Sequence, residues 1–151
     1  MDQNLPFNFR EVQKLTNLGL NPANFKFGGV TFESQKYIVV KDATECSIVN
    51  TTNNFSVEKK PMTAEGVLMH RTKNAIALRQ GKGGSTMIQV FNLETKQKMK
   101  QCEVPEDVRY WRWIGEDELG IVGKSGVYHT SVNNSDAPTK IFDQDAKFTS
   151  A

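Results

Sequence analysis

Short apolar stretches, separated by glycine, asparagine and other turn-forming residues, follow one another along nearly the whole chain. Each stretch has about four to eight residues and no window keeps an apolar period of 3.6, so the pattern predicts strands rather than helices. The strands form three groups of four, and the third strand of each group begins near Cys46, Thr86 and Gly126, 40 residues apart. A repeat of this length with four short strands per unit is typical of β-propeller blades.

The expected strand boundaries follow from the apolar stretches and the turns between them. Segments 75–78 and 120–123 are apolar or small throughout, as expected of inner strands buried on both faces. The predicted fold class is therefore all-β: a β-propeller with WD-repeat-like blades of four antiparallel strands. The predicted strands are 30–34, 37–41, 46–52 and 57–62 in the first repeat, 66–71, 74–80, 86–93 and 98–104 in the second, and 108–115, 118–124, 126–132 and 139–143 in the third.

The beginning of the chain predicts a separate element. Leu5, Phe7 and Phe9 alternate with other residues and predict an opening strand, which a turn-rich connector with the breaker Asn21-Pro22 follows. In a propeller, a strand ahead of the first full blade completes the last blade and closes the ring. We therefore divide the chain into an opening strand and connector at 1–23, blade 1 at 24–63, blade 2 at 64–104, and blade 3 with the chain end at 105–151.

The composition is that of a soluble globular protein, with 24% charged and 38% apolar or aromatic residues among 151. No apolar run approaches about 18 residues, and the N-terminus lacks a basic region followed by an apolar run, so neither a membrane span nor a secretory leader is expected. Cys46 and Cys102 are isolated in strand-like segments. They are interpreted as reduced, buried thiols of a cytosolic protein.

The charge is unevenly distributed along the chain, although the net charge is only +2. Residues 57–100 carry nine Lys or Arg against three Glu, whereas the remainder has an excess of acidic residues. Two interpretations stay open. An acidic partner could dock on the first and second repeats, or the lysines could protect a strand edge from aggregation.

Several sequence features suggest chemistry at first sight but do not predict a catalytic or metal site. Segment 81–86 (GKGGST) lacks a lysine directly after the second glycine of a phosphate loop and precedes a strand, so it predicts a hairpin tip. The acidic triplet 116–118 predicts a solvated turn, and the isolated His70 and His129 predict structural histidines. We therefore expect no enzyme, no catalytic or metal-ligating residues and no cofactor.

The aromatic segment 110–114 alternates, so Trp111 and Trp113 share one face of a strand. Packing between adjacent blades and an aromatic binding platform both fit this pattern, and we favour packing.

A second alternating segment suggests a binding surface. Met87, Gln89 and Phe91 fall on one face of a strand, and Lys96 and Lys98 share a face at the start of the next. An apolar strip beside paired lysines suits an extended peptide with spaced apolar residues and an acidic end.

Beyond these patterns, six segments resemble the clathrin heavy chain family, in the family's order and at nearly its spacing. The resemblance implies a seven-bladed propeller, the terminal domain at the tip of each triskelion leg, of which about three blades are present. The segments are NLGLNPANFKF (17–27), ESQKYIVVK (33–41), QVFNLETKQKMK (89–100), EDVRYWRWIG (106–115), VYHTS (127–131) and TKIFDQ (139–144).

The resemblance also implies a peptide site. The family's propeller binds the clathrin-box motif (leucine, apolar, any, apolar, acidic) of disordered adaptor tails in the groove between blades 1 and 2. Lys60 stands where the family has an arginine, Met87 replaces a threonine, and Glu58 aligns with an apolar residue. Phe27 matches part of a second site whose other members lie beyond Ala151. The implied groove residues are Lys60, Ile76, Met87, Gln89, Phe91, Lys96 and Lys98.

The implied function is a non-enzymatic coat scaffold that recruits endocytic adaptor proteins at the cytosolic face of coated pits and vesicles. Clathrin light chains and other heavy chains would bind only through regions absent from this chain, and neither nucleic acid nor direct membrane insertion is expected. We also expect self-association through exposed apolar faces of blades 1 and 3.

Three alternatives to this reading remain. One is an enzyme with its active site in the propeller's central channel, which would need polar side chains on inner strands. Segments 38–40 and 76–78 are instead apolar. The others are an unrelated WD-repeat-like interaction scaffold and a short stand-alone protein that kept the blades without coat assembly.

Overall fold

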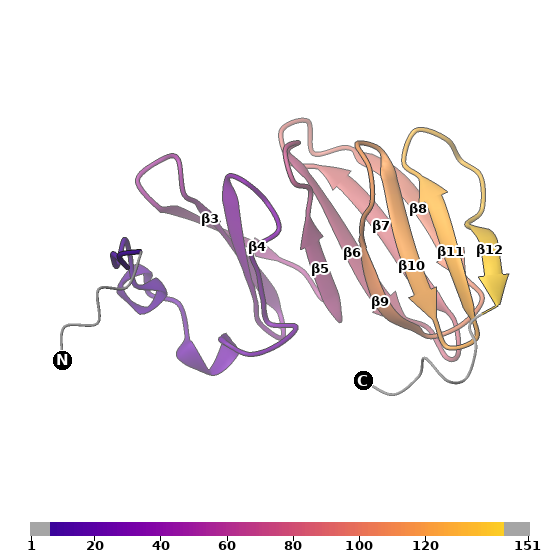
Figure 1. Ribbon diagram of the computed structural model, residues 1–151, viewed down its shortest axis with the longest axis horizontal. Coiled ribbons are helices and arrows are strands. Elements are labelled where there is room, and N and C mark those ends of the chain that lie inside the picture. The colour runs from indigo at the N-terminus through magenta and orange to yellow at the C-terminus, as the bar shows by residue number, and fades with distance from the viewer. Residues whose placement is uncertain (1–6, 144–151) are drawn as a thin grey trace.

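Three four-stranded antiparallel sheets make up the computed structural model, which describes residues 7–143 (Figure 1). In each sheet the strands are neighbours in chain order, so every sheet is a meander, and we refer to the three sheets as blades 1, 2 and 3. The strands are β1 (Val30–Thr31), β2 (Tyr37–Lys41), β3 (Glu45–Asn50), β4 (Ser56–Pro61), β5 (Gly66–Met69), β6 (Ala75–Gly81), β7 (Thr86–Asn92), β8 (Lys98–Val104), β9 (Val108–Trp113), β10 (Glu118–Gly123), β11 (Gly126–Ser131) and β12 (Thr139–Asp143).

All twelve predicted strands are present, and the all-β prediction is confirmed. The largest difference is β1, which ends at Thr31 rather than at residue 34. Beyond Thr31 the chain contacts blade 2, where the backbone amide of Gln35 donates to the carbonyl of Arg71 in the loop after β5, at 2.8 Å. The hairpin tip predicted at 81–86 is also confirmed. Gly83 and Gly84 both have positive φ, as a tight two-residue turn requires.

Two apolar layers hold the blades together. Between blades 1 and 2, Val39 and Ile48 pack against Met69 and Ile76. The layer between blades 2 and 3 contains Ala77, Ile88, Val90, Trp113, Leu119 and Ile121, all buried. Trp111 packs on the same layer, so the packing interpretation of the two tryptophans is confirmed. Cys46 and Cys102 are free and buried, as predicted.

His70 links blade 2 to blade 3 and is a structural histidine, as predicted. Its buried ring packs edge-on against Trp113 with ring centroids 4.6 Å apart. Nδ1 accepts from the amides of Thr72 and Lys73 at 3.1 and 2.9 Å, and Nε2 lies 3.0 Å from the carbonyl oxygen of Glu116. Because Nδ1 accepts two hydrogen bonds, Nε2 carries the proton and donates to that carbonyl. His129 is half-buried on blade 3.

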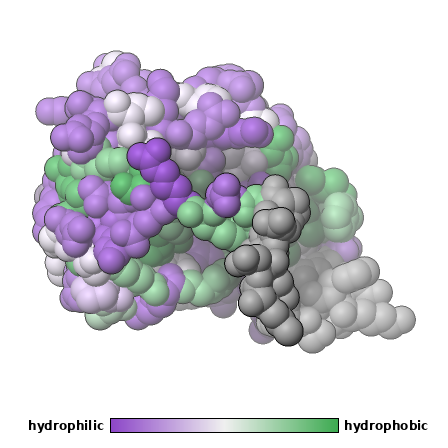
Figure 2. Space-filling model, turned by 60° about the vertical axis from the view of Figure 1, so that its left-hand side comes forward, coloured by the Kyte–Doolittle hydropathy of each residue, from purple (hydrophilic) through white to green (hydrophobic). Residues whose placement is uncertain are grey.

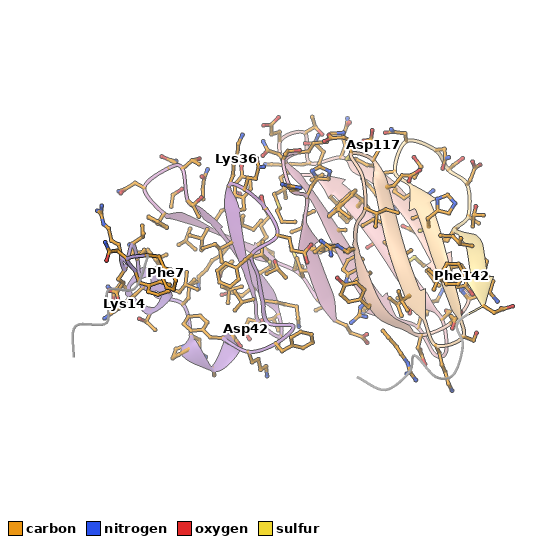
Figure 3. All side chains as sticks on the ribbon, in the orientation of Figure 1. Phe7, Lys14, Lys36, Asp42, Asp117 and Phe142 are labelled. Atoms are coloured by element: carbon orange, nitrogen blue, oxygen red, sulfur yellow. The ribbon has the colours of Figure 1, made fainter. Side chains whose placement is uncertain are left out.

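The acidic turn at 116–118 does more than the solvated turn that we predicted. The Lys73 ammonium, in the turn between β5 and β6, lies 2.7 Å from the carboxylate of Asp117, which is at the top of the molecule in Figure 3. The hydrogen bond from Lys73 lowers the pKa of this carboxyl. The turn therefore adds an ion pair between blades 2 and 3. This ion pair could not be predicted from the sequence, because it depends on where Lys73 lies in the folded chain.

The connector before blade 1 covers a face that we expected to be open. It contains two 3-10 turns, η1 (Leu15–Leu18) and η2 (Pro22–Asn24), and lies on the side of blade 1 away from blade 2 (Figure 1). Leu20 is buried there against Val40 and Val49. The prediction of an exposed apolar face on blade 1 was therefore wrong. Neither of these short turns has the length to cross a membrane.

The predicted opening strand is not seen in the described part of the chain. Residues 7–9 are not in a strand, and Leu5 lies outside the described residues, as does the chain end 144–151. Figure 2 turns this side of the molecule forward, and its surface is a mosaic of apolar and polar patches.

Among residues 7–143, no segment covers the outer face of blade 3, in agreement with the prediction. We use this name for the face carrying Tyr110, Ile114, Val122, Val127 and Phe142. The strand register places Tyr110 beside Val122, Val122 beside Val127, and Val127 beside Phe142, so one apolar row crosses all four strands. Tyr110 is 50% and Phe142 58% exposed, and Figure 3 shows Phe142 at this end of the molecule.

Candidate functional site

The candidate site lies on the face of blade 2 that turns toward blade 1. In the β6–β7 pair, Ile76 lies opposite Phe91 and Leu78 opposite Gln89, with Met87 two residues further along. Alternate residues of a strand share a face, so all five point to the same side. Ile76 belongs to the apolar layer between blades 1 and 2, which identifies that side as the one facing blade 1.

A hollow of about 300 Å³ opens at the edge of this layer and brings together four of the seven predicted groove residues. The end of β4 supplies a lysine, β6 and β7 supply the apolar floor, and the turn after β7 supplies a second lysine. Its lining residues are Lys60, Pro61, Met62, Ile76, Leu78, Phe91, Asn92, Leu93 and Lys96.

A second hollow of about 320 Å³ contains Met87 and Gln89, two more of the predicted residues. Leu78 lines both hollows, so they adjoin along β6 and β7. We refer to the two together as the blade 1–2 groove. Its wall on the side of blade 1 includes Thr63 and Ala64.

The seventh predicted residue, Lys98, lines neither hollow. Its ammonium donates to Oε1 of Gln101 at 2.6 Å, and the side-chain amide of Gln89 donates to the same oxygen at 2.9 Å. Lys98 therefore lies beside the groove and connects to it through Gln101, which sequence reasoning did not single out.

Sequence reasoning also missed Met62, Leu78 and Leu93 as lining residues. Leu78 follows Ile76 by two positions, so strand alternation could have identified it. Met62 and Leu93 come from the segments after β4 and β7, where no alternation applies. Only the packing of blade 1 against blade 2 brings these two side chains to the same hollow.

Three lysines line the groove, Lys60 and Lys96 in the first hollow and Lys82 in the second, and their surroundings differ. The Lys82 ammonium lies 4.0 Å from the carboxylate of Glu103. Lys60 forms an ion pair with Glu58, its neighbour two positions earlier in β4. Lys96 lies in the turn between β7 and β8 with a positive φ of 58°. The Asn92 side chain organises this turn by accepting from the amides of Glu94 and Thr95. Within residues 7–143, no carboxylate oxygen lies within 4.0 Å of the Lys96 ammonium.

Phe27, the predicted part of a second site, lies apart from the groove. It is fully exposed and lines a separate hollow of about 400 Å³ with Asn24, Lys41 and Asp42. A hydrogen bond from the amide of Ala43, followed by one from the Asn24 side chain, lowers the pKa of the Asp42 carboxyl. The structure thus places Phe27 and the groove residues in two distinct regions.

Known proteins similar to this chain are clathrin heavy chains. It is 38% identical over 144 residues to the probable clathrin heavy chain 1 of Caenorhabditis elegans and 37% identical over 148 residues to the probable clathrin heavy chain of Schizosaccharomyces pombe. Clathrin heavy chain 2 of Homo sapiens is 34% identical over 148 residues. These matches cover 93–95% of this chain, which spans only 8–9% of the length of these relatives.

Solved structures support the fold independently. Kluyveromyces lactis Hsv2 superposes with a TM-score of 0.60 at 16% identity, covering 76% of this chain and 35% of that one. A second structure of this protein gives 0.57 at 14% identity, covering 70% and 33%. Hsv2 is a propeller domain. No protein-family model matches the chain. Since the sequence matches extend over nearly the whole chain and the sheets are arranged as in a propeller, the chain is a member of the clathrin heavy chain family, corresponding to a short segment of those proteins.

Proposed function

We propose that this chain is a non-enzymatic coat scaffold whose blade 1–2 groove binds clathrin-box peptides of endocytic adaptors at the cytosolic face of coated pits and vesicles. One observation carries the proposal: Ile76, Phe91 and Lys96 line a single hollow between two blades. An apolar floor beside a lysine that has no carboxylate partner among residues 7–143 suits a peptide with spaced apolar residues and an acidic end.

The expected affinity is modest. Burying each leucine-sized side chain contributes about 1.5–3 kcal/mol, whereas ordering a disordered peptide costs about 2–5 kcal/mol. We expect a Kd on the order of 10–100 μM, about −5.5 to −7 kcal/mol. Such weak binding suffices on a coat, because many copies act together and raise the apparent affinity.

Groove variants test the proposal directly. By calorimetry, Phe91→Ala is expected to weaken binding of an acidic clathrin-box peptide about tenfold, because it removes a large apolar contact. Reversing Lys96 and Lys98 to Glu is expected to abolish detectable binding. Tyr110→Ala, which truncates an exposed aromatic residue on blade 3, is the matched control and should bind normally. Undiminished binding by both groove variants would exclude this groove.

Salt dependence separates the charged contacts from the apolar ones. Because exposed charges are screened over about 8–10 Å, we expect the Kd for the acidic peptide to rise about two- to fivefold between low and physiological ionic strength. A peptide with an amide in place of the carboxylate should show little change. Equal salt dependence for the two peptides would argue against recognition of the acidic end by lysine.

We further propose that purified copies of this chain associate through the outer face of blade 3. The exposed apolar row from Tyr110 to Phe142 supports this partner assignment.

A further inference from the structure

Glu58 lies on the same face of β4 as Lys60, and this face turns toward the groove. Lys60 pairs across the sheet with Cys46, and Glu58 pairs with Ile48. Both partners belong to the apolar layer between blades 1 and 2. Lys59, the residue between them, points to the opposite face, where its ammonium lies 2.9 Å from Glu45.

Glu58 neutralises the Lys60 ammonium, which would otherwise be available to the carboxylate of a ligand. Lys60 lines the groove and its side chain is only 24% exposed, whereas the Glu58 side chain is 64% exposed and lines neither hollow. The carboxylate of a bound peptide would have to displace Glu58 from Lys60 or lie close to it. Either way, much of the attraction to Lys60 is offset by loss of an existing ion pair or by repulsion between two carboxylates.

We propose that Glu58 is a specificity-determining residue of the blade 1–2 groove, which it makes less selective for acidic peptides by neutralising Lys60. This inference rests on the proposed function of the groove. Its consequence is that Lys96, rather than Lys60, attracts the acidic end of the ligand in the first hollow. The groove should therefore prefer an acidic peptide over a neutral one only weakly.

A double-mutant cycle measures this effect. The probes are an acidic clathrin-box peptide and the same peptide with its carboxylates replaced by amides, each titrated by calorimetry. Glu58→Gln is expected to tighten binding of the acidic peptide about two- to fivefold, the range expected for one exposed ion pair. Binding of the neutral peptide should change less than about twofold. In the Glu58→Gln background Lys60→Gln should remove the whole gain, and it should weaken acidic-peptide binding more in that background than in the native one.

Glu45→Gln is the matched control. It makes the same change of charge on the same sheet but releases Lys59, which lies on the face away from the groove. No change in acidic-peptide binding is expected from it. An equal gain from Glu45→Gln would show a general effect of net charge and would overturn the role of Glu58.

The Phe91→Ala variant distinguishes failure of this inference from failure of the proposed function. If Phe91→Ala weakens binding about tenfold but Glu58→Gln leaves the binding of both peptides unchanged, the groove is the site and the role of Glu58 is wrong. If Lys60→Gln weakens acidic-peptide binding in the native background as strongly as Lys96→Gln, the role of Glu58 is also wrong. If neither Phe91→Ala nor the reversal of Lys96 and Lys98 weakens binding, the groove is not the peptide site and Glu58 cannot determine its selectivity.

Discussion

Replacing Glu106 by alanine is expected to lower the free energy of unfolding by about 3 kcal/mol, because it removes the charged partner of a buried network. Glu106 lies in the link between blades 2 and 3, and it is only 9% exposed. Its carboxylate accepts from the hydroxyl of Tyr128 at 2.5 Å and from the amide of Ser125. Its backbone carbonyl accepts from the buried hydroxyl of Thr86 in β7 at 3.0 Å. The alanine variant leaves Tyr128 and Ser125 without this acceptor in the joint between the blades.

Denaturant unfolding measures this loss, and Glu103→Ala provides the matched control. Glu103 is in β8, close in sequence, but its half-exposed carboxylate accepts from Ser85 and pairs with Lys82, both at the exposed hairpin tip. Its removal should change stability by less than about 0.5 kcal/mol. Equal losses in the two variants would contradict a special role for the buried network.

The same network predicts how stability depends on pH. Burial raises the pKa of Glu106, but the hydrogen bonds from Tyr128 and Ser125 outweigh burial, so the pKa lies below its ordinary value of 4.5. The stabilisation by Glu106 is therefore fully present above about pH 4.5 and is lost as the pH falls through the lowered native pKa. Unfolding curves at about pH 7 and about pH 3 should differ less for Glu106→Gln than for the native chain.

The same hydrogen bond also makes stability depend on pH in the alkaline range, through the pKa of Tyr128. Its hydrogen bond to Glu106, followed by burial, raises its pKa from 10.0 to about 12. Since the raised pKa favours the neutral phenol, this stabilisation is present below about pH 10 and is lost as the pH rises through the native pKa. Ultraviolet titration of the tyrosines should show one late group in the native chain, and this group should titrate earlier in Glu106→Gln.

The second large effect is expected in the state of association. At micromolar concentration the purified chain should form dimers or larger species, because the outer face of blade 3 presents an apolar row to water and no segment among residues 7–143 covers it. Three blades are also fewer than the four to eight that close a propeller. Light scattering and sedimentation velocity measure the mass directly.

A single charge at the centre of this face tests the interface. Val122 lies between Tyr110 and Val127 in the apolar row. Val122→Lys should therefore raise the dissociation constant of the assembly about tenfold or more. Asn53→Lys, which adds the same charge in an exposed loop of blade 1, is the control and should not. A compact monomer of 17.0 kDa that unfolds cooperatively at micromolar concentration would contradict this prediction.

The amino-acid sequence by itself determined the strands and the face to which most side chains point. Alternation with period two and turn chemistry depend only on residues close together in the chain. The two-residue turn at Gly83-Gly84 and the shared face of Met87, Gln89 and Phe91 were therefore predictable. The groove's position between two blades came from the family resemblance and not from the pattern.

The tertiary structure decided which surfaces are covered and which charges are free. Nothing local to the connector indicated that Leu20 would be buried against Val49 of blade 1 and close a face that we expected to be open. The network around Glu106 and the contact between Lys98 and Gln101 were likewise absent from the sequence pattern. Such contacts depend on how separate segments pack and on which rotamers that packing allows. Periodicity assigns a side chain to a face, but only the packed structure supplies the partner that buries or neutralises it.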